Sequence, residues 1–144
     1  MSGKMAKNKG ANAEREVAKI LQPIIDEVYE SVGLESPTMK RNLEQTRGGG
    51  YDLVGIDWMA LEIKRQENLS IESWWKQTIK QTLPGQVPVL MYRQNNKKWR
   101  VVMLGAIRSS KTSAVSMRVE ISLNDFLRWF TTRAMNELKL AERP

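Results

Sequence analysis

The sequence predicts an α/β fold in which a mixed central β-sheet is flanked by helices. Three observations support this prediction. Apolar residues recur at helical spacing near both ends of the chain, short apolar runs between them suit strands, and Gly or Pro residues separate these segments. The chain has 144 residues, which suits a single domain over residues 1–144 with one hydrophobic core.

The first predicted helix covers residues 11–32, and Gly33 is a suitable residue to end it. Pro23 lies inside this pattern and is compatible with a kink or with two separate helices. Residues 1–10 are rich in lysine, including Lys9, and carry no apolar run. We interpret them as a flexible basic arm, either a solvated tail or a segment that contacts phosphates and orders on binding.

The remaining elements follow in alternation. The predicted order is an irregular strand within 38–47, strands at 51–56 and 59–64, a helix at 71–83, strands at 87–92 and 99–104, a loop at 105–115, a strand at 116–121 and a final helix from Leu123. Ser70 and Ser122 are the predicted N-caps of the two later helices.

The composition excludes several chemistries. The chain contains no Cys and no His, which excludes disulfides, thiolate zinc sites, Cys nucleophiles and the usual Ser-His-Asp triad. Any catalysis must therefore depend on carboxylates, Lys, Tyr, Ser or Thr, and carboxylates favour a hard metal ion such as Mg²⁺. The net charge of +7 favours a polyanionic partner such as nucleic acid.

The expected cellular location follows from the absence of a membrane helix and of a secretory signal in the sequence. No apolar run approaches the roughly 20 residues that a membrane helix needs, so we expect no membrane association. The polar N-terminus argues against a secretory signal. We therefore expect a cytoplasmic protein, in the host cytoplasm if the gene is viral.

Two charged side chains occupy a strand that is apolar enough to be central in the sheet. Side chains alternate between the two faces of a strand, so Glu62 and Lys64 point to the same face of the segment 59–64. Charge is costly to bury, and this placement therefore needs a reason. An ordinary ion pair on an exposed face is the simpler interpretation, since Glu-x-Lys is common by chance.

A second carboxylate precedes this strand. If residues 51–56 and 59–64 form a hairpin, the loop 56–58 sets Asp52 opposite Glu62. Two carboxylates held this close repel each other, and a divalent cation relieves the repulsion. Glu14, on the apolar stripe of the first helix, also points towards the sheet. Taken alone, Glu14 is better explained as an acid stabilised by the dipole of the first helical turn, and it becomes a site candidate only beside Asp52, Glu62 and Lys64. Glu16 lies on the opposite side and is expected to be solvated.

Three segments now occur in order, namely Lys9–Glu16 with the sequence KGANAERE, Gly48–Val54 with the sequence GGGYDLV, and Leu61–Lys64 with the sequence LEIK. Together they resemble the PD-(D/E)XK nuclease superfamily, and more narrowly the archaeal and phage type of Holliday-junction resolvases. The resemblance covers residues 9–65, under half of the chain. One departure is Tyr51, which stands where the superfamily has Pro.

The resemblance implies a restriction-endonuclease-like core and a role for each residue. Asp52 and Glu62 would bind Mg²⁺, for which Mn²⁺ would substitute, together with the main-chain carbonyl of Ile63. Glu14 would complete the site or help to hold a second ion. Lys64 would orient or activate the attacking water and stabilise charge on the phosphate.

Further residues are implied in substrate binding and assembly. Lys9, Arg15, Arg41 and Arg47 are the candidates for DNA phosphate contacts, each with a solvated surface charge as the alternative. Gln77 is a possible addition to the active site, since related nucleases often place a Gln there. Of Trp74 and Trp75, one is expected in the core and the other in a homodimer contact that suits two symmetric cuts.

The leading interpretation is a homodimeric, Mg²⁺-dependent endonuclease that resolves four-way DNA junctions by paired nicks, in DNA recombination or repair. A restriction-like or repair endonuclease of the same fold is the nearest competing interpretation. A DNA-binding protein without catalysis is another, although it would not need three carboxylates at one place. The last is an interaction protein whose basic charge is incidental.

Overall fold

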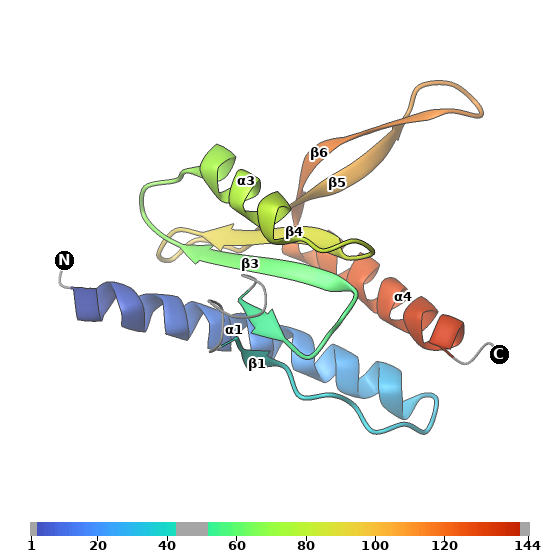
Figure 1. The fold of residues 1–144 in the computed structure, drawn as a ribbon, viewed down its shortest axis with the longest axis horizontal. Coiled ribbons are helices and arrows are strands. Elements are labelled where there is room, and N and C mark those ends of the chain that lie inside the picture. Colours follow the sequence, from blue (N-terminus) through green and yellow to red (C-terminus); the bar gives the residue numbers. More distant parts are fainter. Residues whose placement is uncertain (1–2, 43–51, 142–144) are drawn as a thin grey trace.

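The computed structural model describes residues 3–42 and 52–141. These residues fold into a mixed four-stranded β-sheet with helices on both faces (Figure 1). In chain order the elements are α1 (Gly3–Glu30), β1 (Lys40–Arg41), β2 (Leu53–Val54), β3 (Met59–Arg65), α3 (Ile71–Gln81), β4 (Val87–Arg93), β5 (Arg100–Arg108), β6 (Ala114–Ser122) and α4 (Leu123–Ala141). This arrangement confirms the predicted α/β fold class.

The sheet has the strand order β3-β4-β5-β6. β3 and β4 are parallel, with Glu62 opposite Leu90, and α3 provides the crossover that a parallel pair requires. The other two pairs are antiparallel, which makes the sheet mixed. No helix in the described ranges is both long enough and apolar enough to cross a bilayer.

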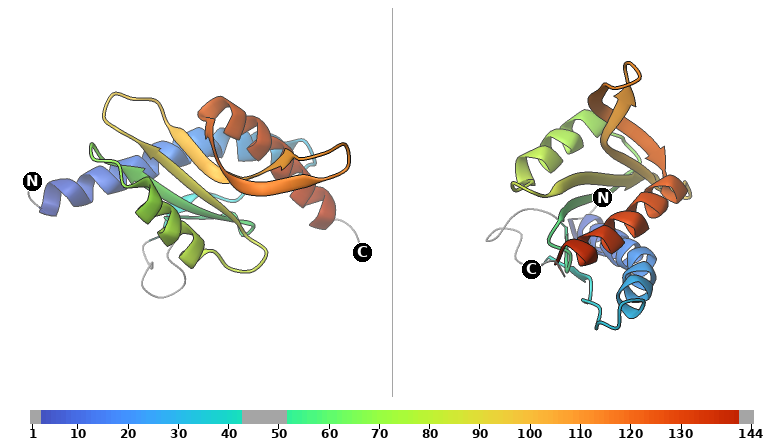
Figure 2. Two further views of the ribbon diagram at one scale, coloured as in Figure 1. Left: turned by 90° about the horizontal axis from the view of Figure 1, so that it is seen from above. Right: turned by 90° about the vertical axis from the view of Figure 1, so that its right-hand side faces the viewer.

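The alternation of side chains divides the sheet into two packed faces (Figure 2). Met59, Leu61 and Ile63 of β3 belong to the larger core, which α1 and α4 cover. The opposite face packs Leu90, Tyr92 and Val102 against α3. Trp74 and Trp75 of α3 both belong to this smaller core, with exposed fractions of 5% and 9%. The prediction that one of the two is free for a dimer contact is therefore wrong.

Helix α1 is longer than its apolar stripe predicts. It begins at Gly3, so the segment predicted as a flexible arm is helical from that residue onward, and it continues past Pro23 without dividing. Its end follows the prediction. Gly33 adopts a φ of +74°, its N–H donates to the Glu30 carbonyl, and the Leu34 N–H donates to the Tyr29 carbonyl. This pair of hydrogen bonds is a Schellman motif, which favours Gly because of the left-handed conformation.

The predicted hairpin between residues 51–56 and 59–64 is not formed. β2 instead pairs antiparallel with β1, with Leu53 opposite Arg41 and Val54 opposite Lys40, in a separate two-stranded sheet. The apolar pattern of the segment correctly predicts a strand, but the choice of pairing partner depends on residues distant in sequence.

The predicted loop over 105–115 is also wrong, because β5 runs on to Arg108 and β6 begins at Ala114. Gly105 lies inside β5, and packing between the strands accounts for a glycine at this position. A Cβ on Gly105 would lie 2.9 Å from Cγ2 of Val119 in the neighbouring strand, so a glycine lets the two strands approach. At the other end of β6, the predicted cap is present, since Ser122 Oγ accepts the Asp125 N–H at 3.1 Å. The Ser70 side chain, in contrast, makes no capping hydrogen bond to α3.

Gly55, next to β2, is expected to tolerate no side chain. Its φ is +125°, and a Cβ would lie 2.9 Å from the Thr38 carbonyl oxygen and 3.1 Å from Met39 Cα. Gly55→Ala should therefore lower the free energy of unfolding by about 1–3 kcal/mol, measured by urea denaturation. Gly10→Ala is the matched control, because a Cβ at this helical position meets nothing within 4 Å and should be neutral or stabilising.

Candidate active site

A cleft of about 630 Å³ opens at the C-terminal end of β3. The residues around it are Lys9, Gly10 and Glu14 from α1, Asp52, the run from Glu62 to Asn68 that starts in β3, and Asn95 in the turn after β4. The structure thus brings together all four predicted catalytic residues, which lie on three separate segments of the chain.

Asp52 is fixed against β3 by its main chain and by its carboxylate. Its N–H donates to the Leu61 carbonyl at 2.8 Å, and its Oδ2 accepts the Ile63 N–H at 2.6 Å. The residue is only 6% exposed. Asp52 therefore reaches the neighbourhood of Glu62 without a regular hairpin, because these hydrogen bonds hold it beside the middle of β3.

Glu62 is a buried carboxylate that is incompletely satisfied. It is 2% exposed, and its Oε1 lies 3.4 Å from Lys64 Nζ. Its Oε2 has no hydrogen-bond partner among the residues that the structure describes. Burial, reinforced by the charge of Asp52, raises the pKa of Glu62 to about 8, although the Lys64 ammonium acts in the opposite direction.

Glu14 lies at the rim of the same cleft, where its side chain is already paired. Arg41 Nε donates to Glu14 Oε2 at 2.6 Å, and the Glu14 side chain is 15% exposed. The negative charge of Glu14 also contributes to the raised pKa of Glu62. The ion pair joins α1 to β1 and holds the Glu14 carboxylate beside the cleft.

The chemistry of Asp52 and Glu62 fits a divalent cation. A buried carboxylate oxygen without a partner, beside a second carboxylate, is the environment that a bound Mg²⁺ or Mn²⁺ would stabilise. Glu14 is less suited to bind the cation, because its carboxylate already pairs with Arg41. In agreement, no group of three or more carboxylates in residues 3–42 and 52–141 is close enough together to hold a metal ion as it stands.

Glu16 is a residue whose importance the sequence did not indicate, since its position predicted a solvated side chain. It accepts hydrogen bonds from Arg93 Nη2 at 3.0 Å and from Trp99 Nε1 at 2.8 Å, and Arg65 Nη1 lies 3.9 Å away. Partial burial opposes ionisation of Glu16, but the hydrogen bonds from Arg93 and Trp99 outweigh it and lower the pKa. This network, two residues after Glu14, ties α1 to β3, to β4 and to Trp99, the residue before β5.

Removal of the Glu16 carboxylate should loosen α1 from the sheet. We expect Glu16→Ala to lower the free energy of unfolding by about 1–3 kcal/mol, because the buried Trp99 N–H and the Arg93 guanidinium lose their acceptor. Glu27→Ala on the exposed side of α1 should change it by less than about 0.5 kcal/mol. Equal effects of the two substitutions in thermal or urea unfolding would contradict this role.

The predicted DNA contacts are distributed unevenly. Lys9 lines the cleft, and the exposed Arg15 donates to Asn12 Oδ1 at 3.1 Å on the same helix. Arg41 is engaged with Glu14, and Arg47 lies outside the described residues. Gln77 is half-buried on α3 and does not line the cleft, so its part in the site stays a prediction.

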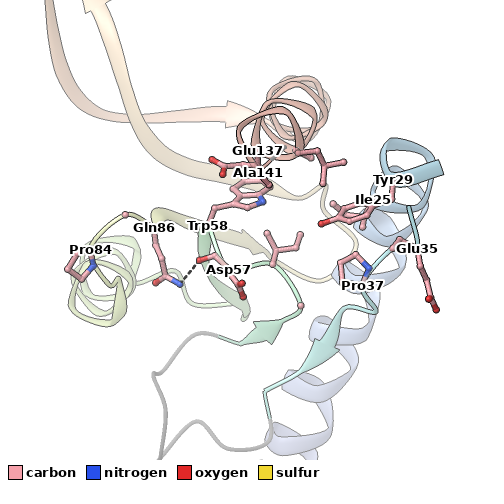
Figure 3. Close-up of a pocket in the computed structure, with 16 residues that line it drawn as sticks. Ile25, Tyr29, Glu35, Pro37, Asp57, Trp58, Pro84, Gln86, Glu137 and Ala141 are labelled. Carbon is pink, nitrogen blue, oxygen red and sulfur yellow. Dashed lines mark hydrogen bonds between the residues drawn. The ribbon is translucent and has the colours of Figure 1, made fainter. Parts of the chain in front are cut away.

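A second and larger cleft, of about 750 Å³, lies between the C-terminal parts of α1 and α4 (Figure 3). Trp58 and Tyr29 line it, and two of its polar side chains are engaged: Gln86 Nε2 donates to the Asp57 carbonyl at 3.0 Å, and Glu137 pairs with Arg133 at 2.8 Å. None of the predicted catalytic residues lines this cleft. The smaller cleft is therefore the candidate active site despite its size.

A buried Asp beside a strand that carries Glu and Lys two residues apart, in a mixed sheet between helices, defines a nuclease of the PD-(D/E)XK class. Residues 5–142 match the model of a protein family described as phage putative PDDEXK endonuclease, and the chain belongs to this family. Searches of curated proteins and of solved structures gave no match.

Proposed function

We propose that the protein is a Mg²⁺-dependent endonuclease that resolves four-way DNA junctions by paired nicks, acting as a homodimer in the cytoplasm. The observation that supports a metal-dependent reaction most strongly is Glu62, which lies beside Asp52 and Lys64 and whose buried Oε2 has no hydrogen-bond partner within residues 3–42 and 52–141. The narrower choice of a junction rests on the resemblance of residues 9–65 to resolvases of the archaeal type.

In the proposed reaction, Asp52 and Glu62 hold the cation, with the Ile63 carbonyl as a further ligand and Glu14 at the rim. The bound cation would lower the pKa of a water molecule and polarise the phosphate. The Ile63 N–H fixes the orientation of the Asp52 carboxylate by a hydrogen bond of 2.6 Å. The hydrogen bond from the Ile63 N–H holds the Asp52 carboxylate in place before the substrate arrives, and less reorganisation is then needed for the reaction.

Lys64 supplies the positive charge next to the reacting phosphate. Its Nζ is held 3.4 Å from Glu62 Oε1, and its side chain remains 21% exposed towards the cleft. A Lys ammonium can donate to an attacking water and to a phosphate oxygen, and thereby stabilise charge that develops in the transition state. Lys9, which also lines the cleft, would contact a neighbouring phosphate, and Arg15, Arg41 and Arg47 are the further proposed DNA contacts.

The proposal is tested with a labelled four-way junction and a linear duplex of the same sequence, each with Mg²⁺ or with EDTA. Paired nicks on the junction alone, dependent on Mg²⁺ and lost in Glu62→Ala, are the expected result. Equal cutting of both substrates would contradict junction specificity and leave an endonuclease of the same fold. Binding without cutting in Mg²⁺ and in Mn²⁺ would contradict the catalytic function itself.

A further inference from the structure

The outer edge of β6 is a long unpaired strand edge. β6 has nine residues and is the last strand of the sheet, and no strand in the described part of the chain pairs with its outer side. The β5–β6 hairpin extends beyond the helices, on the side away from the N-terminal half of α1 (Figures 1 and 2). Exposed edges of this length tend to pair with another strand, and proteins that remain monomeric usually cover or interrupt them.

The side chains along β6 alternate between two chemically different faces. On the face that continues the main core, Val115, Met117, Val119 and Ile121 follow one another, and Met117 and Val115 are 41% and 50% exposed. The opposite face of the strand carries two charges, Arg118 and Glu120. The edge therefore combines an exposed apolar row with one positive and one negative charge two residues apart.

From this pattern we infer that the partner of β6 is β6 of a second copy of the chain, paired antiparallel edge to edge. The inference rests on the proposed function and deepens it, because it names the surface of the proposed homodimer. It replaces the α3 surface, where Trp74 and Trp75 are buried.

The charges of β6 select one register. Directly opposed residues in an antiparallel pair share a face of the sheet. The two-fold axis between two identical strands therefore passes midway between one residue and the same residue of the second copy, and that residue identifies the register. An axis through Arg118 or through Glu120 sets two like charges opposite each other. An axis through Met117 leaves both charges opposite neutral residues, Ser116 and Ala114.

An axis through Val119 sets Arg118 opposite Glu120 of the second copy and Glu120 opposite its Arg118. This register makes two opposite-charge cross-strand pairs. It also sets the exposed Met117 opposite Ile121 of the second copy, so that the apolar row continues across the boundary. Within the chain, Arg118 pairs with Glu72, while Glu120 pairs with Arg100 and accepts a hydrogen bond from the Tyr92 hydroxyl. The two ion pairs are exposed enough to rearrange.

A nucleic acid fits this edge less well than a second copy does. Surfaces that bind DNA are strongly positive, whereas the apolar row of β6 carries no charge and Glu120 would face phosphate. In the paired arrangement the two-fold axis is perpendicular to the sheet. The helices α1 and α4 of both copies then cover the same face of a continuous sheet, and each copy keeps its own active-site cleft.

The test measures mass in solution by sedimentation over a concentration series, without DNA and without metal, so that it does not depend on catalysis. The wild type should approach twice the 16.6 kDa of one chain. Arg118→Glu and Glu120→Arg each create like-charge pairs across the axis and should weaken the dimer at least about tenfold. A mixture of the two variants restores opposite charges at both pairs and should form a heterodimer.

Three controls accompany these variants. Arg108→Glu makes the same charge change as Arg118→Glu, on β5 and outside the paired segment, and Glu72→Gln removes the partner of Arg118 within the chain; both should leave the dimer intact. Circular dichroism checks that every variant is folded.

Several outcomes would overturn the inference. They are a monomeric wild type at all concentrations, a dimer unchanged by Arg118→Glu, and a mixture that stays monomeric. A change in DNA affinity without any change in mass would also overturn it, and would assign the edge to DNA. Failure of junction cutting alone would leave the dimer result unaffected.

Discussion

Replacement of Glu62 by Gln is expected to abolish DNA cleavage and at the same time to stabilise the metal-free protein. The carboxylate is 2% exposed and its pKa is raised from 4.5 to about 8, by burial first and then by the charge of Asp52. The folded state therefore holds a proton that the unfolded chain releases at lower pH. Gln keeps the shape of the side chain but needs no ionisation.

The pH dependence follows from the direction of this shift. Below about 4.5 the carboxyl is protonated in both states and causes no loss of stability. As the pH rises from 4.5 to about 8, the unfolded state ionises first, so stability is lost, and the loss is complete above 8. Since one pKa unit corresponds to about 1.4 kcal/mol, the stabilisation by Glu62→Gln should reach a few kcal/mol at pH 8 and vanish near pH 4.

Thermal unfolding at several pH values measures this effect. Addition of Mg²⁺ or Mn²⁺ should raise the melting temperature of the wild type and raise that of Glu62→Gln less, because a neutral amide oxygen binds a divalent cation more weakly than a carboxylate does. A variant that is less stable than the wild type at pH 8 would contradict the assignment of Glu62 as a buried, unsatisfied carboxylate.

Replacement of Lys64 by Met should also abolish most of the activity, but with the opposite effect on stability. We expect cleavage to slow by roughly 10²–10⁴-fold, the range typical for loss of a group that assists proton transfer. Because the Lys64 ammonium lowers the pKa of Glu62, its removal leaves the Glu62 carboxylate without a nearby cation. The free energy of unfolding should therefore fall at and above pH 8, where the wild-type carboxylate ionises, and change little near pH 4.

Lys64→Arg is the matched control, since it keeps a positive charge beside Glu62. It should retain most of the stability at pH 8 while the cleavage rate falls, because a guanidinium differs from an ammonium in size and geometry. Single-turnover cleavage and urea unfolding of the two variants give both quantities. Equal cleavage rates of Lys64→Met and the wild type would contradict a role of Lys64 in the reaction.

The sequence predicted the parts of the site that depend on local periodicity. The alternation along β3 placed Glu62 and Lys64 on one face, and the helical spacing of α1 placed Glu14 towards the sheet; the structure brings all three to one cleft. The position of Asp52 near Glu62 was also predicted, although by a hairpin that the structure does not contain.

The features that the sequence did not reveal depend on partners distant along the chain. Glu16 has the spacing of a solvated residue, and its role arises only because Arg93 and Trp99 reach it from β4 and the start of β5. The pairing of Arg41 with Glu14 likewise joins two segments that no local pattern relates. The extension of β5 and β6 into the predicted loop also depends on packing between distant residues, since Gly105 allows a close approach to Val119.

The most direct test of the central claim, that the cleft at the end of β3 is a metal-dependent nuclease site, is the nicking of supercoiled plasmid in Mg²⁺. The wild type should convert the plasmid to the open circular form, and EDTA or Glu62→Gln should prevent this. Glu137→Gln, in the larger cleft, should retain the wild-type rate. Nicking that persists in EDTA or in Glu62→Gln, or that is lost in Glu137→Gln, would contradict the assignment of the active site.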